Sequence, residues 1–412
     1  MKAAELFLRA MNKRPTIAFW FRYGAAEHTE LFHALPDLLE ALAENVDIHY
    51  FGMKSDRPIP ERIRNCVTIH ELPFHVRRTS NADKMFKTLV WILALPWLAR
   101  KTRSLGIQAV YIDETIPFTV YAAQLWVGPR VAVTVADFFV DIYLAPHAVL
   151  RPLARWIRQF DINAWKKAAL IITRAKTTRD YLATQGIDPT RVLPIYDPCD
   201  ETVFYPTDKT ACRKEFGYTD HDVVLVHHGI LHPNKGNDRI LVAMARILKT
   251  HPHVKYLLVG DGPDMPRLKA LVEELGLQAS VKLTGWLPGR GDVNRALNAG
   301  DIGLVMRVGH ESDNFHMTGA LVHAMACGLP ILAARLGGIS EAVRENHNGF
   351  LFDPVCGEEF DDKFRRMLDD RSLRRQMGDA ALTDARELFS MSSVIKRTVD
   401  ALVTFAAGES RS

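Results

Sequence analysis

One segment, from His310 to Ala342, constrains the fold of this chain more than any other. It reads as a loop, a helix with Gly319 near its start, an apolar strand at Leu329–Ala334, and a paired-glycine turn, Gly337–Gly338, that opens a second helix. Close alternation of helix and strand is typical of a parallel α/β sheet. The two helix N-termini then face one crevice at the strand ends, each with N–H groups that lack intrahelical partners. The segment therefore predicts an anion site that suits a diphosphate.

The rest of the chain repeats this alternation of strand and helix. With 412 residues it is long enough for two α/β domains. We expect a helix from about Glu27 to Glu44, and turn residues between Thr202 and Lys209 are typical of a linker. The expected strands, besides the one above, are Pro15–Phe21, Asp47–Met53, Val67–Leu72, Ala109–Ile112, Arg130–Val135, Leu170–Thr173, Val192–Ile195, Val223–His228, Tyr256–Val259, Val281–Thr284 and Ile302–Met306.

These elements predict an α/β fold of two doubly wound, Rossmann-like domains facing a central cleft. We place the first domain at residues 1–205 and the second at 206–390. A C-terminal helix at 391–412 is expected to pack back on the first domain. Ligands of such domains bind at the carboxyl ends of the strands.

Composition excludes several classes of protein. A net charge of +4 is mild, so it suggests a basic face and no nucleic-acid partner. The five cysteines have no paired spacing, which indicates neither a disulfide framework nor a zinc site and favours a reducing cytosol. The first fifteen residues have no long apolar region and do not read as a secretory signal.

The C-terminal half resembles the donor domain of retaining, nucleotide-sugar-dependent glycosyltransferases of the family-four type, which have the GT-B fold. The stretch GILHPNKGNDRIL, Gly229–Leu241, resembles the family's phosphate loop, in which a lysine before a glycine reaches the donor diphosphate. Here that pair is Lys235 and Gly236. Gly260 and Gly262, in LLVGDGPD, match the glycine turn that lies close to the donor. A solvated turn lysine is the plainer interpretation of Lys235.

The chain departs from the family at its cations and acids. The family's arginine after the first glycine of the phosphate loop is Ile230 here, and Arg307 is the replacement that the resemblance implies. In the family, one glutamate contacts the hydroxyls of the donor sugar and a second contacts the ribose. The residues at the corresponding places here are His316 and His323, in that order. A neutral imidazole offers one donor and one acceptor to a hydroxyl.

Other residues of this segment compete for the same roles. The register of His316 is open by one residue, and Glu311 or Asp313 is an alternative source of the carboxylate. His323 also fits a packed helix histidine. Glu341 matches the family's last acid, or is a first-turn residue stabilised by the helix dipole. Thr318, which precedes Gly319, completes the set of donor-site candidates, together with Gly337 and Gly338.

The N-terminal half is expected to bind the acceptor. YGAAEH, from Tyr23, resembles the family's first glycine-rich loop and places Gly24 at the reaction centre. VTVADFF ends a strand where relatives have His-Asp, and Asp137 is the carboxylate left to orient or deprotonate an acceptor hydroxyl. Asp141 is the nearby alternative to Asp137, and Asp113–Glu114 is a third acidic site. The structural alternative is that Asp137 serves as an N-terminal helix cap. We name Asp137 and His316 as the catalytic candidates.

Two stretches bear on a membrane partner. The apolar run Leu89–Ala99 is shorter than the roughly 20 residues of a bilayer span, so we interpret it as a core helix. The stretch Leu150–Ala168 interleaves basic and aromatic residues, which suits an anionic lipid surface. A solvated helix face is the alternative, and His75, Arg77 and Arg78 lie in a loop that could join the surface. The proposed contacts are Arg151, Arg155, Trp156, Arg158, Trp165, Lys166 and Lys167.

The resemblance implies a glycosyltransferase that moves a sugar from a nucleotide donor to a hydroxyl of a glycan or lipid-linked glycan. It implies retention at the anomeric carbon, no metal and no further cofactor, with UDP-sugar first and GDP-sugar second as co-substrate. The enzyme would act in the cytoplasm, at the inner face of the membrane. Two alternatives stay open: a nucleotide-sugar 2-epimerase on the same fold, and a non-catalytic subunit that binds nucleotide or glycan.

Overall fold

The computed structural model of the chain describes residues 14–55, 57–72, 81–144, 147–309, 311–315 and 317–408. They form two compact units. The first unit reaches Ile195 and takes up the chain again from Val394, and the second runs from Tyr196 to Ser393. Each unit is built on one parallel sheet, so the predicted pair of doubly wound, Rossmann-like α/β domains is confirmed.

The first unit has a seven-stranded sheet in the order β3-β2-β1-β4-β5-β6-β7. Its strands are β1 (Thr16–Trp20), β2 (Asp47–Met53), β3 (Thr68–Leu72), β4 (Ala109–Ile112), β5 (Val131–Val135), β6 (Leu170–Thr173) and β7 (Val192–Pro194). The order reverses beside β1, and such a reversal leaves a crevice at the carboxyl ends of the strands.

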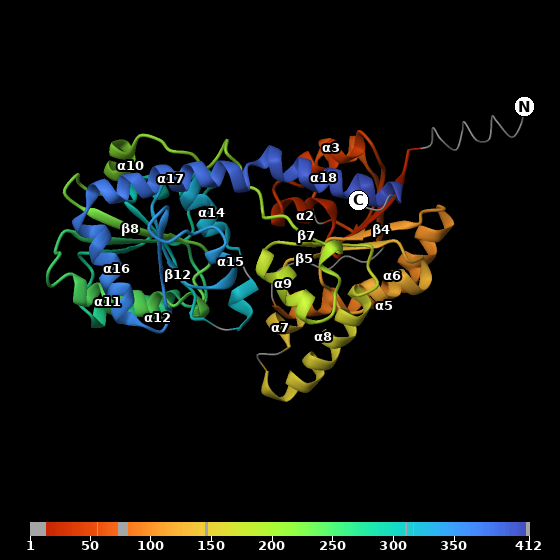
Figure 1. Cartoon of the computed structure of the whole chain (residues 1–412), viewed down its shortest axis with the longest axis horizontal. Helices are drawn as coiled ribbons and strands as arrows, with labels where there is room; N and C mark the ends of the chain where they lie inside the picture. The colour runs from red at the N-terminus through yellow and green to blue at the C-terminus, as the bar shows by residue number, and fades with distance from the viewer. Residues whose placement is uncertain are drawn as a thin grey trace, which may run out of the picture. The chain divides into compact units, whose positions relative to one another are not determined.

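Helices cover both faces of this sheet (Figure 1). They are α2 (Ala25–Leu31), α3 (Leu35–Ala43), α4 (Glu61–Cys66), α5 (Asn81–Ser104), α6 (Thr119–Trp126), α7 (Phe139–Tyr143), α8 (Arg151–Trp165), α9 (Lys176–Thr184) and α18 (Met391–Ala407), with single 3₁₀ turns at η1 (Ala148–Leu150) and η2 (Pro189–Arg191). Helices α5, α6 and α8 lie side by side. Helix α3 and residues 394–406 of α18 contribute to one core with β1 and β2.

The second unit has a six-stranded sheet in the order β10-β9-β8-β11-β12-β13. Its strands are β8 (Val223–His228), β9 (Val254–Val259), β10 (Val281–Leu283), β11 (Ile302–Val305), β12 (Ile331–Ala334) and β13 (Gly349–Phe352). Its helices are α10 (Lys209–Phe216), α11 (Asn237–Ile247), α12 (Met265–Glu274), α13 (Arg290–Ala299), α14 (Gly319–Ala326), α15 (Gly337–Ser340), α16 (Gly357–Asp369) and α17 (Arg371–Phe389), with 3₁₀ turns at η3 (Pro233–Lys235) and η4 (Glu311–Phe315).

Helices α11, α12 and α16 cover one face of the second sheet, and α10, α13, α14 and α17 the other (Figure 1). Buried strands alternate with apolar helix faces, and all six strands contribute to one continuous core. Every pair in this sheet is parallel, so the loops after β8, β9, β11 and β12 meet at one edge.

The predicted strands are all present, with ends that shift by at most two residues. Two predicted helices need correction, and one strand was missed. The helix expected over Glu27–Glu44 is two helices, because Pro36 near the start of α3 cannot continue the preceding helix. The helix after Gly337 is a single turn. Strand β13 was missed because four residues between turns give little periodicity.

The division between the units falls at Ile195, whereas the sequence suggested residue 205. Tyr196, Cys199 and Phe204 account for the difference, because all three pack in the core of the second unit. At the other end of the chain, Val394 and Leu402 of α18 are buried in the core of the first unit.

Candidate functional site

The lysine of the predicted phosphate loop lies at the carboxyl edge of the second sheet. Lys235 ends the 3₁₀ turn η3, and Gly236, with φ of +61°, starts helix α11. The loop is held against the end of β11, because the Val308 N–H donates to the Asn234 carbonyl at 2.9 Å. This bond brings the segment that carries Arg307 beside the segment that carries Lys235.

The two cations sit in a poorly hydrated place with one acidic neighbour. Burial and, to a smaller extent, the charge of Arg307 lower the pKa of Lys235 to about 8, against the opposing charge of Asp313. Arg307 is buried and donates through Nη1 to Asp313 Oδ1 at 2.9 Å. Its Nε has no hydrogen-bond partner within the described ranges. Among the side chains that the structure describes here, two cations face one carboxylate, and this excess of positive charge suits an anionic ligand.

The glycines of the GDG turn have a clear packing role. A Cβ on Gly260 would lie 2.0 Å from the Gly229 carbonyl oxygen, and one on Gly262 would lie 2.3 Å from that of Leu231. Both glycines also have φ in the left-handed half of the map, at +124° and +158°. The Gly229 and Leu231 N–H groups donate to Val259 and Asp261 at 2.9 and 2.8 Å. The turn therefore holds the start of the phosphate loop in place.

Thr318 and Gly319 form the N-terminus of α14 as predicted by their sequence. The Thr318 hydroxyl caps the helix by accepting from the Leu321 N–H at 3.3 Å. The Gly337 N–H, at the start of the α15 turn, donates to Asn314 Oδ1 at 3.1 Å. The α14 cap and the glycine pair Gly337–Gly338 thus follow the neighbouring strands β11 and β12.

Glu341 follows the α15 turn and accepts a hydrogen bond from the Tyr196 hydroxyl at 2.9 Å. Its carboxylate is half-buried. Glu311 lies in the 3₁₀ turn η4, but its side chain is outside the described part of the structure, as is the whole of His316. The assignments of those two residues remain predictions.

A second histidine joins His323 in the donor half. His323 Nδ1 and His228 Nε2 lie 3.2 Å apart, with ring centroids 5.1 Å apart and planes at 15°. The other face of His323 stacks on Phe204 at 3.7 Å. Burial lowers the pKa of His228 well below its usual value, and the neighbouring His323 lowers it further. The sequence analysis missed His228, although its place at the end of a strand was a usable signal.

In the first unit, three loops meet at the carboxyl edge of β1, β4 and β5. The Arg22 N–H donates to Glu114 Oε1 at 2.5 Å, and Arg22 Nε lies 3.4 Å from Glu114 Oε2. Thr115 donates through its hydroxyl to the Asp137 carbonyl at 2.5 Å, which ties the loop after β4 to the loop after β5. Burial raises the pKa of Glu114 to about 7. Asp137 is half-buried at this edge.

Behind these loops lies a buried polar cluster that the sequence analysis did not find. His28 Nε2 is 3.3 Å from Asp113 Oδ2, and His28 Nδ1 is 3.1 Å from the Tyr50 hydroxyl. The Tyr111 hydroxyl donates to Asp113 Oδ1 at 2.7 Å. With both ring nitrogens engaged and the ring buried, His28 supports the loop rather than facing a ligand. Gly24 is needed here because a Cβ would lie 2.8 Å from the Met53 carbonyl oxygen, a backbone atom, as well as 2.1 Å from Ser55 Oγ.

The proposed membrane residues of α8 separate into two groups. Trp165 is buried and lies 6.0 Å from the Phe138 ring, so it is not on the surface. Arg158 donates to Asp141 and to the Tyr181 hydroxyl, at 2.8 and 2.7 Å, and Lys166 is half-buried. The exposed members are Arg151, Arg155, Trp156 and Lys167. In the part of the chain that the structure describes, no helix is long and apolar enough to cross a bilayer.

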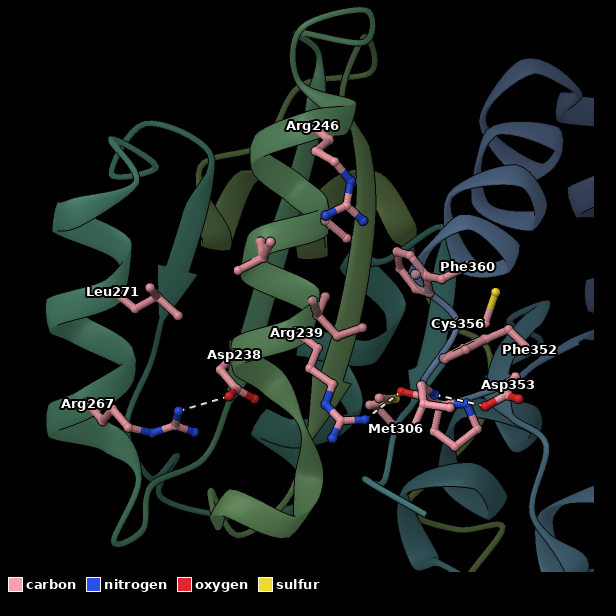
Figure 2. Close-up of a pocket in the computed structure, with 16 residues that line it drawn as sticks. Asp238, Arg239, Arg246, Arg267, Leu271, Met306, Phe352, Asp353, Cys356 and Phe360 are labelled. Atoms are coloured by element: carbon pink, nitrogen blue, oxygen red, sulfur yellow. Dashed lines mark hydrogen bonds and ion pairs between the residues drawn. The ribbon is translucent and has the colours of Figure 1, made fainter.

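A pocket of about 580 Å³ opens between α11, α12 and the loop after β13. Figure 2 shows Arg239 reaching across it to the Pro354 carbonyl, at 2.6 Å, and Arg267 paired with Asp238 at 2.9 Å. None of the predicted site residues lines it. Within the described ranges, no three His, Cys, Asp or Glu side chains are grouped as metal ligands.

Comparison with known proteins finds relatives of the half of the chain that holds Lys235 and Arg307. Residues 208–384 match the model of the family described as glycosyl transferases group 1. The N-acetyl-alpha-D-glucosaminyl L-malate synthase of Bacillus anthracis is 26% identical over 77% of this chain and 81% of its own length. The D-inositol 3-phosphate glycosyltransferase of Segniliparus rotundus is 28% identical over 60% of this chain, which spans about half (54%) of that relative.

Solved structures show the fold. Anabaena Alr3699/HepE in complex with UDP superposes with a TM-score of 0.69 at 17% identity, over 95% of this chain and 100% of that one. The sucrose-phosphate synthase of Thermosynechococcus elongatus gives 0.74 at 18% identity, over 96% and 100%. The predicted GT-B fold is therefore confirmed.

Proposed function

We propose, from the match of residues 208–384 to the model of the glycosyl transferases of group 1, that this chain transfers a sugar from a nucleotide-diphosphate donor to a hydroxyl acceptor. UDP-sugar is the favoured donor and GDP-sugar the second. A neighbour in fold, Anabaena Alr3699/HepE, was solved in complex with UDP, which supports a uridine donor. The acceptor class that we propose is a glycan or lipid-linked glycan, used at the cytoplasmic face of the membrane.

The observation that carries the proposal is the excess of positive charge that Lys235 and Arg307 give to the described part of this site. Asp313 is the carboxylate paired with Arg307, and Arg307 Nε still lacks a partner in the described structure. A desolvated lysine with a pKa of about 8 gains its full charge when an anion approaches. A diphosphate would supply that anion and fill the hydrogen-bonding capacity of Arg307.

The same groups have a role in the chemical step. As the bond between sugar and diphosphate breaks, negative charge grows on the leaving oxygen. Lys235, Arg307 and the capped N-terminus of α14 stabilise this charge without reorganising, because they are held in place beforehand. We propose net retention at the anomeric carbon and no required metal, since fixed cations do the work that a metal would otherwise do.

The remaining candidates are assigned to the sugar and the acceptor. His323 and Glu341 are proposed to bond hydroxyls of the nucleotide and sugar, with His316 on the donor sugar. Asp137, at the end of β5, is proposed to orient or deprotonate the acceptor hydroxyl. Two relatives have names that specify small acceptors, L-malate and D-inositol 3-phosphate. A small hydroxylated acid or phosphate is therefore the second acceptor class to test.

The first experiment is a thermal-shift screen of the full chain with UDP, GDP, ADP and CMP. A ligand that binds only the folded state raises the melting temperature by mass action. We expect the largest shift with UDP and its loss in Lys235→Ala, whereas Lys214→Ala, an exposed lysine on α10, should respond like the parent. Equal UDP-induced thermal shifts in Lys235→Ala and Lys214→Ala would show that Lys235 does not bind the nucleotide.

Reaction products then separate the enzyme classes. A transferase releases UDP and consumes sugar only when an acceptor is present, apart from slow hydrolysis. A nucleotide-sugar 2-epimerase would change the donor sugar with no acceptor. A protein that binds UDP but turns over no donor with any acceptor would favour the non-catalytic alternative. Asp137→Asn should reduce turnover with little loss of UDP affinity.

A further inference from the structure

Helix α5 has an exposed apolar stripe that the fold does not use. The run Leu89–Ala99 was expected to be a core helix, and only one side of it is buried. Leu93 is 71% exposed, and three more large side chains at spacings of three and four residues share its face: Phe86, Leu89 and Trp97. Such spacing aligns side chains along one side of a helix.

The stripe continues onto the two neighbouring helices. Leu125 on α6 and Trp156 on α8 are 58% and 57% exposed, and Tyr121 and Leu153 are exposed beside them. The Phe160 ring joins α6 to α8, with centroid distances of 5.0 Å to Tyr121 and 5.9 Å to Trp156. Because α5, α6 and α8 lie side by side (Figure 1), these side chains form one surface, which we call the α5–α6–α8 face.

Two arginines extend the α5 stripe toward its C-terminal end. Arg100 and Arg103 follow Leu93 and Trp97 at helical spacing, and with Pro96 and Trp126 they line a pocket of about 260 Å³. Neither guanidinium has a hydrogen bond or ion pair with any residue that the structure describes. Two exposed cations beside an exposed tryptophan and a proline form a small anion-accepting pocket at the edge of an apolar surface.

The charged residues of the α5–α6–α8 face are mainly basic. Helix α6 has no charged residue, and the acidic residues of α5 and α8 are Asp83 and Asp161. Asp161 is buried and accepts from the Phe118 N–H at 2.9 Å, so it adds nothing to the surface. Basic residues of the same helices include Arg100, Lys101, Arg103, Arg151 and Arg155.

We propose that the α5–α6–α8 face docks on an anionic phospholipid bilayer, with a lipid phosphate held by Arg100 and Arg103 against Trp126. Apolar side chains such as Leu93 would enter the headgroup boundary, tryptophan would lie at the interface, and the arginines would bind phosphate. A second copy of the chain fits this surface less well, because a two-fold interface would bring two positively charged faces together. The inference stands on the face itself and does not depend on the donor chemistry proposed above.

Vesicle flotation of the full chain tests the proposal. The probes are vesicles of phosphatidylcholine alone and of phosphatidylcholine with an equal amount of phosphatidylglycerol. We expect binding to the mixed vesicles and little binding to the neutral ones. Arg100→Glu/Arg103→Glu should weaken binding by at least about tenfold, since each basic residue near an anionic surface contributes on the order of 1 kcal/mol. The matched control is Lys249→Glu/Lys269→Glu, which makes the same charge change on exposed lysines of the second unit.

A second pair of variants tests the apolar part. Leu93→Glu should reduce binding to the mixed vesicles, while Val355→Glu, at an equally exposed valine of the second unit, should not. Equal binding by the arginine variant and its lysine control, or no binding of the parent, would overturn the proposal. So would a stable dimer that Leu93→Glu converts to monomer without any vesicle binding. The thermal shift with UDP should be the same in all these variants, which separates a failed membrane face from a failed donor site.

Discussion

His228 Nε2 lies 3.2 Å from His323 Nδ1, and the two nearly parallel rings form a bonded pair at the carboxyl end of β8. A hydrogen bond between two imidazoles needs one N–H and one lone pair, so at least one ring must be neutral. Burial lowers the pKa of His228 well below its usual value and keeps that ring neutral. The hydrogen bonds that His323 can offer a ligand are therefore set in part by a second imidazole.

Removing His323 should affect folding through its partner. His323→Leu leaves His228 Nε2, which is only part-buried, without that partner, so we expect the free energy of unfolding to fall by about 1 kcal/mol in urea titrations. Replacing both residues by leucine should cost less than the sum of the two single variants, because removal of both partners leaves no orphaned polar group. His253→Leu, at an exposed histidine, is the control and should stay within about 0.5 kcal/mol. Additive single effects would contradict the pairing.

The ionisation of Lys235 predicts how donor affinity depends on pH. Its pKa is about 8 in the free protein, and a bound diphosphate favours the charged form and so raises that pKa. Affinity for UDP should therefore be flat below pH 8 and fall above it, by up to about tenfold per pH unit. Lys235→Arg should abolish this decline, because arginine stays protonated. Calorimetry in two buffers of different ionisation enthalpy should show proton uptake on UDP binding near pH 8, and its absence would contradict the prediction.

Variants of the Arg307–Asp313 ion pair should affect protein stability and UDP binding differently. Arg307→Ala should lower the free energy of unfolding by about 3–5 kcal/mol, as loss of one partner of a buried ion pair does, and should reduce the UDP-induced thermal shift. Asp313→Asn should also destabilise the free protein, but it removes a negative charge from the site and should increase the UDP-induced shift. Arg62→Ala, in a pair whose arginine is exposed, should change stability by less than about 1 kcal/mol. A smaller shift in Asp313→Asn would contradict this account.

The fold was predictable because its strands are short apolar runs between turn residues. Val223–His228 and Ala109–Ile112 have the predicted bounds, since a buried parallel strand has no polar alternation to blur its ends. The break before Pro36 was not predicted, although a proline near a helix start was a usable signal. Strand β13 was not predicted either, because its four residues fit a turn as well as a strand.

The site was only partly predictable, because partners distant in sequence decide what a residue does. Lys235 and Arg307 follow from local motifs, whereas the pairing of His323 with His228 depends on contacts across the sheet. The composition of their segments does not indicate that Trp165 is buried and Leu93 is exposed. Both lie in helices with apolar residues on more than one side, and only packing determines which side faces the core.

The glycines of the GDG turn give a direct test of the phosphate-loop geometry. Gly260→Ala would place a methyl group against the Gly229 carbonyl, where the calculated Cβ separation is 2.0 Å, and a backbone atom cannot swing aside as a side chain can. We expect a loss of several degrees in melting temperature and a weaker UDP-induced shift, because the loop that carries Lys235 must move. Gly291→Ala, on α13 with open space around its Cβ, is the control and should be neutral or slightly stabilising. An unchanged UDP response in Gly260→Ala would separate this turn from the donor site.

Asp161 predicts a pH dependence of stability in the first unit. Burial raises the pKa of this carboxyl to about 7, and Asp161 Oδ1 accepts a hydrogen bond from the Phe118 N–H. An acid with a raised pKa in the folded state binds its proton more tightly there than in the unfolded chain. The folded state therefore loses stability as pH rises from about 4, the unfolded value, to about 7, at up to roughly 1.4 kcal/mol per pH unit.

Asp161→Asn keeps an oxygen for the Phe118 N–H and has no charge to bury, so its melting temperature should exceed that of the parent at pH 8 and approach it at pH 4. Asp188→Asn, at an exposed aspartate, should not show this widening difference. Parallel melting curves for the parent and Asp161→Asn across that range would show that Asp161 is ionised in the folded protein.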